Sequence, residues 1–282
     1  MTKESPQQET QQKEPMAYIA RVIASSINEL NATVSTIEVT FPRFILPQVS
    51  KHGLFSISTS SMRAMPVRKV VEASTFTPLT WRRDEKGMSP SGIVDNEAAI
   101  EAEELWKNAM DSAGYYATRL ADLGIAKETA NRLVEPFAWC TCVITSSYWA
   151  NFLELRLAPD SQVEIRDLAA VIVCAMARVV PRKVSRTGMH LPYINNNDRA
   201  ELDRDSLAMV SAARCARVSY GRVLEDRAHE ADIELFHRLA HGKHWSPLEH
   251  VLLPVRSRKV RGRQHPSWLS FRNVVEGASS RK

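Results

Sequence analysis

The chain of 282 residues is poor in cysteine, with only Cys140, Cys142, Cys174 and Cys215. Four cysteines are too few for a disulfide scaffold in a chain of this length. The Cys-x-Cys pair at 140–142 has no second Cys or His pair at zinc spacing, so the sequence predicts no metal site. We expect buried free thiols instead.

Long apolar runs are also absent. No stretch of eighteen apolar residues occurs, so the sequence predicts no membrane span. Residues 1–15 are mostly Gln, Glu, Lys and Pro, without the apolar core of a secretory signal. We therefore expect a disordered tail at 1–15, a single catalytic domain at 16–282, and a cytoplasmic protein.

Positive charge is in excess, with a formal net charge of +5. Such a balance favours acidic partners, and both nucleotides and nucleic acids fit it. The basic segment at 255–263, VRSRKVRGR, keeps a non-enzymatic nucleic-acid-binding protein open as one interpretation. A steep dependence of DNA binding on salt is expected only for that interpretation.

Residue periodicity predicts a mixed fold of helices and strands. Alternating or short apolar runs predict strands at 18–25, 36–41 and 251–255. Segments without periodicity, at 74–95 and 181–198, predict surface connections. Capping boxes are expected at Ser161–Glu164 and Ser246–Glu249. Helices are expected after Pro42 and at about 96–123, 127–136, 137–157, 161–180, 202–217, 229–240 and 268–275.

The segment 41–66 concentrates hydrogen-bond donors after an apolar run. Phosphate oxygens accept several charge-assisted hydrogen bonds, so hydroxyls beside fixed cations suit a phosphate. A serine-rich surface loop has the same composition, and the residues alone leave both interpretations open. Within sixteen residues the donors are Gln48, Lys51, His52, Ser56, Ser58, Thr59, Ser60, Ser61 and Arg63.

A second polar group comprises Arg132, Asn151, Arg156, Gln162 and Glu164. Asn151 and Arg156 lie five residues apart in an otherwise mostly apolar helical stretch. A buried guanidinium needs a partner, so an inward-facing Arg156 would have a function. The alternative is that both side chains lie on the solvated face.

These segments resemble known motifs. The pattern H-x-x-F-S-x-x-x-x-S-x-R-A-x-P, from His52 to Pro66, resembles the signature of flavin-dependent thymidylate synthases, especially their long, phage-type branch. The run N-F-L-E-L-R-x-x-x-D-S-Q-x-E-I at 151–165 and R-L-V-E-P at 132–136 resemble two further family motifs. At four positions the chain differs from the long branch: Lys51 replaces Thr, Gly53 replaces Arg, Ser58 replaces Asn and Asp160 replaces His.

The C-terminal part carries two more motifs. The segments A-R-C-A-R-V-S-Y at 213–220 and H-W-S-P-L-E-H at 244–250 resemble sequences that short family members carry near their N-terminus. Residues 208–282 therefore resemble the N-terminal part of those members. The displaced order looks like a circular permutation, which is tolerated when chain ends lie close together.

The resemblance implies an α/β (α+β) fold with a central, mostly antiparallel sheet flanked by long helices, in a homotetramer with sites at subunit interfaces. It implies transfer of a one-carbon unit from methylenetetrahydrofolate to C5 of dUMP, with hydride from reduced FAD, NADPH as reductant, and no cysteine nucleophile. Because the central loop is altered, a flavin- and folate-dependent hydroxymethylase acting on dUMP or dCMP, as a modified-base phage would use, stays open.

The resemblance also implies roles for particular residues. Arg156 and Ser61 would act on the reacting base. FAD would be bound by His52, Asn151, Ser246 and Glu249. The pyrimidine nucleotide would be bound by Gln48, Lys51, Ser61, Arg63, Arg132 and Arg156.

Overall fold

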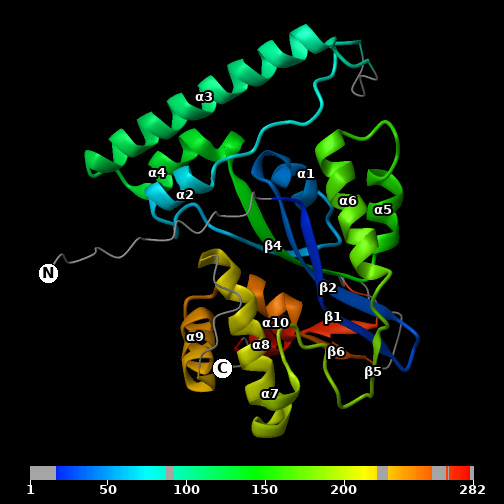
Figure 1. Ribbon diagram of the computed structural model, residues 1–282. Coiled ribbons are helices and arrows are strands. Elements are labelled where there is room, and N and C mark those ends of the chain that lie inside the picture. Colours follow the sequence, from blue (N-terminus) through cyan, green and yellow to red (C-terminus); the bar gives the residue numbers. More distant parts are fainter. Residues whose placement is uncertain (1–16, 87–91, 221–227, 256–264, 266, 280–282) are drawn as a thin grey trace, which may run out of the picture.

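The computed structural model describes residues 17–86, 92–220, 228–255, 265 and 267–279. The expected tail at 1–15 and the basic residues 256–263 lie outside these. The centre is a five-stranded sheet with the order β3-β4-β2-β1-β5, in which β5 runs parallel to β1 and the other pairs are antiparallel (Figure 1). This confirms the predicted mixed fold around a mostly antiparallel sheet.

The strands of this sheet are β1 (Ile19–Asn28), β2 (Thr33–Pro42), β3 (Ser56–Thr59), β4 (Trp139–Ser146) and β5 (Arg182–Val184). A smaller antiparallel pair consists of β6 (Leu252–Pro254) and β7 (Trp268–Ser270). The 3₁₀ helices are η1 (Arg43–Ile45), η2 (Asn131–Phe137), η3 (Arg217–Tyr220) and η4 (Ser246–His250).

Helices cover both faces of the sheet (Figure 1). Helix α6 packs on β1 and β2, whereas η3 and η4 contact β3 and β4. No helix in the described part of the chain is both long and apolar enough to cross a membrane. The α-helices are α1 (Leu46–Ser50), α2 (Val67–Ala73), α3 (Asn96–Asp122), α4 (Lys127–Ala130), α5 (Trp149–Arg156), α6 (Val163–Met176), α7 (Asn196–Glu201), α8 (Arg204–Ala216), α9 (His229–His241) and α10 (Phe271–Ser279).

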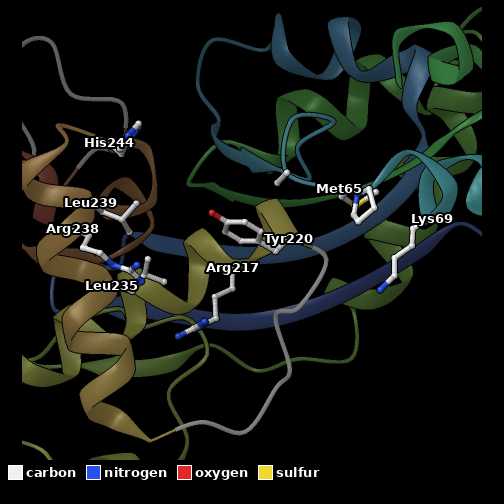
Figure 2. A pocket seen from close by; sticks show the side chains of 10 residues that line it. Met65, Lys69, Arg217, Tyr220, Leu235, Arg238, Leu239 and His244 are labelled. Carbon is white, nitrogen blue, oxygen red and sulfur yellow. The ribbon is translucent and has the colours of Figure 1, made fainter. Parts of the chain in front are cut away.

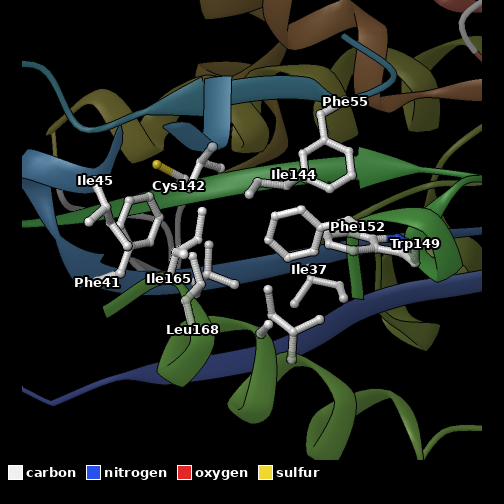
Figure 3. Packing of buried hydrophobic residues seen from close by; sticks show 14 of the residues in the cluster. Ile37, Phe41, Ile45, Phe55, Cys142, Ile144, Trp149, Phe152, Ile165 and Leu168 are labelled. Carbon is white, nitrogen blue, oxygen red and sulfur yellow. The ribbon is translucent and has the colours of Figure 1, made fainter. Parts of the chain in front are cut away.

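One face of the sheet is apolar. Alternate residues of β2, Ile37 and Phe41 among them, are fully buried against Ile165 and Leu168 of α6 (Figure 3). Full burial of one such side chain contributes about 1.5–3 kcal/mol. A register slip by one residue would turn this apolar set away from α6, so the packing determines which residues of β2 face the other side.

The opposite face is buried and polar. Thr36 and Thr145 lie side by side, with their hydroxyl oxygens 2.6 Å apart. The Nε2 atom of His190 lies 2.8 Å from the Thr36 hydroxyl, and Nδ1 of His250 lies 2.8 Å from the Thr145 hydroxyl. The second imidazole nitrogen of His250, Nε2, lies 2.9 Å from the Ser58 hydroxyl. This chain of hydrogen bonds fixes η4 against β3 and β4.

An ion-pair cluster holds the helices below the sheet together. Arg214 bridges Asp198 of α7 and Asp232 of α9, at 2.7 and 3.0 Å, and Arg217 contacts the same Asp232 at 2.5 Å. Burial would raise the pKa of Asp198, but the hydrogen bonds from Arg214 outweigh burial and lower that pKa to about 2. Paired in this way, buried charges can be tolerated between helices.

Several predicted elements are confirmed. The strands at 18–25, 36–41 and 251–255 correspond to β1, β2 and β6, and the helices at 202–217 and 229–240 correspond to α8 and α9. The long helix at 96–123 is α3, and Gly124 follows it with a φ of 76°, a conformation that glycine adopts without strain.

The predicted helix at 137–157 is wrong. Residues 139–146 form strand β4, paired on both sides with β2 and β3, and only Trp149–Arg156 is helical. A strand in the middle of a sheet with both faces covered has a continuous apolar run, which periodicity alone does not distinguish from a buried helix.

Both predicted capping boxes are also wrong. Helix α6 begins at Val163 after Gln162, without a side-chain cap, and ends at Met176 rather than near 180. The Ser161 hydroxyl donates instead to the carbonyl of Leu155. At 246–250 the chain forms a 3₁₀ helix without a side-chain cap, and Glu249 binds Arg272.

Two more boundaries differ from the predictions. The expected loop at 181–198 contains β5 and the start of α7, because pairing of Arg182–Val184 with β1 makes a strand that its own residues do not signal. The last helix does not begin at 268: residues 268–270 pair with β6, and α10 follows at 271.

The cysteine predictions hold in part. Cys140, Cys142 and Cys215 are buried, but Cys174 is exposed because it lies on the side of α6 that faces away from the sheet. Cys140 and Cys142 belong to β4, not to a helix as expected. Burial raises the pKa of the Cys140 and Cys215 thiols.

Acid should unfold the protein through its buried histidines. Burial, reinforced by neighbouring histidines, lowers the pKa of His190 and His250 from 6.5 to about 3. The unfolded chain therefore binds more protons between these values, and the free energy of unfolding falls as the pH drops from 6.5 towards 3. Each histidine should contribute about 1.4 kcal/mol per pH unit.

Denaturant unfolding at pH 7, 6 and 5 measures this dependence. His250→Gln should lower the free energy of unfolding at pH 7. It should also reduce the slope of that free energy against pH by about 1.4 kcal/mol per pH unit, the contribution of one histidine. His241→Gln, on the exposed end of α9, is the control and should leave the slope unchanged. An unaltered slope in His250→Gln would contradict the assignment.

Candidate anion-binding site

A cavity of about 330 Å³ lies where β3 ends. Hydroxyl and guanidinium groups dominate its lining. We call it the serine–arginine cavity; its polar lining residues are Arg43, Ser58, Thr59, Ser60, Ser61, Arg63, Arg132, Ser219 and Ser246.

Backbone hydrogen bonds hold the hydroxyl-bearing loop in place. The amide of Ser60 donates to the carbonyl of Thr141 at 2.8 Å, which continues the pairing with β4. The amide of Ser61 donates to the carbonyl of Ser219 at 3.1 Å, and the Ser61 hydroxyl accepts from the amide of Arg63. The turn at Ser61 is therefore built by contacts to two distant segments.

Carboxylates accompany the arginines of this cavity. Glu135 accepts from Arg132 Nη1 at 2.6 Å and from Arg43 Nε at 2.9 Å, and Glu128 lies 3.0 Å from Arg63. Burial would raise the pKa of Glu135, but the hydrogen bonds from the two arginines outweigh it and hold that pKa below its usual value. Three guanidinium groups facing two carboxylates leave positive charge in excess.

The two C-terminal motifs reach the same cavity. Ser219 comes from η3, the end of the 213–220 motif, and Ser246 begins η4, in the 244–250 motif. Their segments are joined to β3 by the Ser61–Ser219 and Ser58–His250 hydrogen bonds. Residues about 160–190 positions apart in the chain thus line one hollow.

A second group of expected site residues lies before β3. Gln48 is hydrogen-bonded to Gln162, and the ring of His52 packs on Phe55 and Phe152, with centroids 4.3 and 5.6 Å away. Burial and then the nearby charge of Arg156 lower the pKa of His52. Its Nε2 atom is buried without a hydrogen-bond partner among the described residues.

The remaining members of this group lie close by in the chain. Lys51 follows α1 and is exposed, and Asn151 occupies the exposed side of α5. Asn151 thus lies on the solvated face of its helix. Glu164 faces a different cavity, beside Tyr18 and Trp139.

The expected site residues therefore form two groups at the two ends of β3. The serine–arginine cavity collects Ser61, Arg63, Arg132 and Ser246, while Gln48, Lys51, His52, Asn151 and Arg156 lie near α1 and α5. A strand of four residues separates the groups by on the order of 10 Å. Glu249 belongs to neither group, because Arg272 holds it at 2.5 Å.

Sequence reasoning missed Arg43 and Ser219. Arg43 follows the end of β2 directly and bears no motif, so only the fold shows its place. Ser219 lies inside the recognised 213–220 motif, which was the available signal.

A larger hollow of about 660 Å³ was also missed. Figure 2 shows Tyr220 between Met65 and Lys69 on one side and Leu235, Arg238 and Leu239 of α9 on the other. Three motif segments meet here. Ala64–Pro66 end the 52–66 motif, Arg217 belongs to the 213–220 motif, and His244 begins the 244–250 motif. Its mixture of cations and apolar groups suits a large anionic ligand.

The hydroxyls and guanidinium groups at the end of β3 are the chemistry of a phosphate-binding protein. The chain belongs to the thymidylate synthase complementing protein family, whose family model matches residues 1–182. This confirms the family resemblance, and the motifs at 52–66, 132–136 and 151–165 lie within the matched residues.

Two curated relatives are flavin-dependent thymidylate synthases from two strains of Thermus thermophilus, each 29% identical over 153 residues. The match covers 51% of this chain and 52% of each relative, so the chain spans about half the length of the curated relatives it matches.

Two solved structures of the UMP/dUMP methylase PolB from Streptomyces cacaoi are also similar. The complex with 5-Br UMP is 17% identical with a TM-score of 0.47, covering 57% of this chain and 89% of that one. The complex with 5-Br dUMP is 20% identical with a TM-score of 0.44, covering 52% and 67%. Likenesses of this size are too weak to establish a shared activity.

The serine–arginine cavity should bind inorganic phosphate, and its two exposed arginines should contribute similarly. The side chains of Arg63 and Arg132 are 76% and 56% exposed, so solvent screens their charge. Each change to Ala should weaken phosphate binding by about fivefold, or about 1 kcal/mol, in a calorimetric titration. Arg68→Ala removes an equally exposed charge outside the cavity and should have no effect. Equal weakening in all three variants would contradict a site here.

Proposed function

We propose that this protein is a flavin-dependent thymidylate synthase, which transfers a one-carbon unit from methylenetetrahydrofolate to C5 of dUMP to form dTMP. The observation that carries the proposal is the convergence of Ser61, Arg63, Arg132 and Ser246 on one cavity in a chain of this family. The names of the curated relatives agree with it.

The nucleotide phosphate binds in the serine–arginine cavity. Ser61 offers a hydroxyl at a turn held by two backbone contacts, and Arg63 and Arg132 supply forked, permanently charged donors. On binding, the phosphate takes over the hydrogen bonds that Glu128 and Glu135 now accept from these arginines. The carboxylates thus keep the arginines in position while the phosphate is absent.

The pyrimidine ring would be bound by the group of residues near α1 and α5. Gln48, Lys51 and Arg156 lie at the other end of β3 from the phosphate cavity of the same chain. Two copies of the chain in a homotetramer can bring one copy's phosphate cavity beside the other copy's Arg156. In that setting Arg156 stabilises negative charge that develops on the base, as an oxyanion hole does, and Ser61 helps to polarise the nucleotide.

The loop expected to hold FAD has an unpartnered ring nitrogen and open space. His52 has a buried, unpartnered Nε2, and Gly53 leaves space, since a Cβ placed there would meet nothing within 4 Å. FAD would be held by His52 and Asn151 from one group, by Ser246 from the other, and by Glu249, which Arg272 would have to release. The chemistry that FAD supplies is hydride transfer, with NADPH as reductant.

The C-terminal motifs support a permuted family member. In short members the equivalent segments precede the His-Arg loop, and here they follow it yet lie against β3 through Ser58–His250 and Ser61–Ser219. A circular permutation preserves such contacts, because it changes chain order without moving segments in space. On this basis we assign residues 16–282 to one catalytic domain. The proposal also takes the enzyme to act in the cytoplasm, where its nucleotide substrate would be used.

A flavin- and folate-dependent hydroxymethylase is the second candidate. Gly53 in place of the arginine of long-branch members removes a cation and leaves open space beside His52. A hydroxymethyl product on dUMP or dCMP would follow if water reached the transferred carbon there. Identification of the product separates the two reactions.

The purified protein should be yellow and should convert dUMP to dTMP when supplied with methylenetetrahydrofolate and NADPH. Arg156→Ala should lower kcat by about a hundredfold, because one preorganised donor to developing charge is lost. Arg166→Ala on the neighbouring helix is the control, since its Nη1 contacts the carbonyl of Pro159. A folded, flavin-loaded protein that yields 5-hydroxymethyl nucleotide would replace the first candidate with the second.

Turnover should not depend on any thiol. Burial raises the pKa of Cys140 and Cys215, and no cysteine lines the serine–arginine cavity. A variant with all four cysteines changed to Ser or Ala should keep its turnover within about tenfold. Complete loss in a folded, FAD-loaded variant, rescued by restoring one cysteine, would show covalent catalysis instead.

A further inference from the structure

A cavity of about 340 Å³ lies between the start of β1 and the first turns of α6. It contains no residue that we assign to the nucleotide or to FAD. We call it the aromatic–acidic cavity; its lining residues include Tyr18, Phe76, Leu79, Trp139, Glu164 and Asp167.

Three aromatic rings meet at this cavity nearly at right angles. Tyr18 and Phe76 each lie 5.5 Å from Trp139, at interplanar angles of 78° and 81°. Rings in different planes can present both faces and edges to one small ligand. The negative face of an aromatic ring attracts cations.

Hydrogen bonds to distant segments hold the Phe76 wall. The amide of Phe76 donates to the carbonyl of Phe137 at 2.9 Å, and its carbonyl accepts from Trp106 Nε1 at 2.8 Å. Phe76 as a whole is 4% exposed. This part of the long connection at 74–95 is therefore fixed in place before any ligand binds, which lowers the entropy cost of binding.

Two carboxylates complete the lining. Glu164 and Asp167 lie three residues apart on one side of α6, and the negative charge of both helps burial to raise the pKa of Tyr18. Burial also raises the pKa of Asp167, since only Arg166, next to it in the chain, favours the charged form. Arg166 itself contacts Pro159.

Within the described part of the chain, Arg166 acts on Asp167 only at a distance, and no cation contacts either carboxylate. Neither carboxylate forms an ion pair there, and no Lys, Arg or His lines the cavity. The cavity thus has two partly desolvated negative charges beside three ring systems. Burial of unpaired charge is costly, and a bound cation would recover that cost.

We propose that the aromatic–acidic cavity binds a small organic ammonium ion, with its alkyl groups against the rings of Tyr18, Phe76 and Trp139 and its charge facing Glu164 and Asp167. An alkylated ammonium is favoured over a metal ion, because it loses little hydration and gains contact with ring faces. It is favoured over a neutral apolar molecule because both carboxylates attract it.

Choline and its neutral isostere 3,3-dimethyl-1-butanol test the role of charge at nearly constant shape. Each is titrated at fixed ionic strength into the full-length ¹⁵N-labelled protein, and the indole N–H signal of Trp139, assigned with Trp139→Phe, is followed. Choline should saturate that signal and bind at least about tenfold more tightly than the isostere. Equal affinities, or no saturation with choline, would overturn the proposal.

Charge removal provides the second test. Glu164→Gln/Asp167→Asn keeps the shape of the cavity, and choline affinity should fall by about tenfold or more, with the fold checked by circular dichroism. Glu104→Gln/Asp111→Asn removes the same charge from exposed positions of α3 and should change the affinity less than twofold. Retained choline affinity in the first double variant, or equal loss in both, would refute the site. Phosphate affinity, measured by equilibrium dialysis, should be the same in both double variants as in the unchanged protein. That result would separate this cavity from the nucleotide site.

Discussion

The imidazole of His250 is the contact on which the arrangement of the candidate site depends. Its two nitrogens lie 2.8 and 2.9 Å from the hydroxyls of Thr145 and Ser58, and the side chain is fully buried. A buried ring nitrogen without a partner is costly, so η4 has one favourable position against β3 and β4. That position brings Ser246 to the serine–arginine cavity. The hydrogen bonds continue from Thr145 to Thr36 and from Thr36 to His190, so the segment around His190 is fixed on the same face of the sheet.

The short strand β3 divides the expected site into two parts. Ser61 and Arg63 follow the strand, whereas Lys51 and His52 precede it, so a single chain holds the residues proposed for the phosphate and those proposed for the base at opposite ends of β3. The proposed assembly of several copies would unite them.

Charge balance is arranged differently at the two cavities flanking the sheet. At the serine–arginine cavity, Glu128 and Glu135 partly neutralise three guanidinium groups and keep them in place for an anion. At the aromatic–acidic cavity, Glu164 and Asp167 have no such partners in the described residues. The first is suited to exchange of one anion for another, and the second to a cation. The family assignment accounts for the first cavity but offers no role for the second.

Much of the local structure could be read from the sequence. The alternation of β2, the periodicity of α3 with Gly124 after it, and the hydroxyl-rich segment around Ser61 are local patterns, and local patterns determine period, caps and candidate donors. The motifs also indicated the family. Strand β4 was predicted as a helix because an apolar run buried on both faces has no distinguishing period. Strand β5 was predicted as a loop because its extended conformation depends on pairing with β1 and not on its own residues. Only the tertiary structure decided which hydrogen-bond donors lie together. The contacts of Arg43, Ser219 and His250 join segments that are far apart in the chain. Such contacts depend on burial and on hydrogen-bond pairing between distant segments, which local sequence preference does not determine.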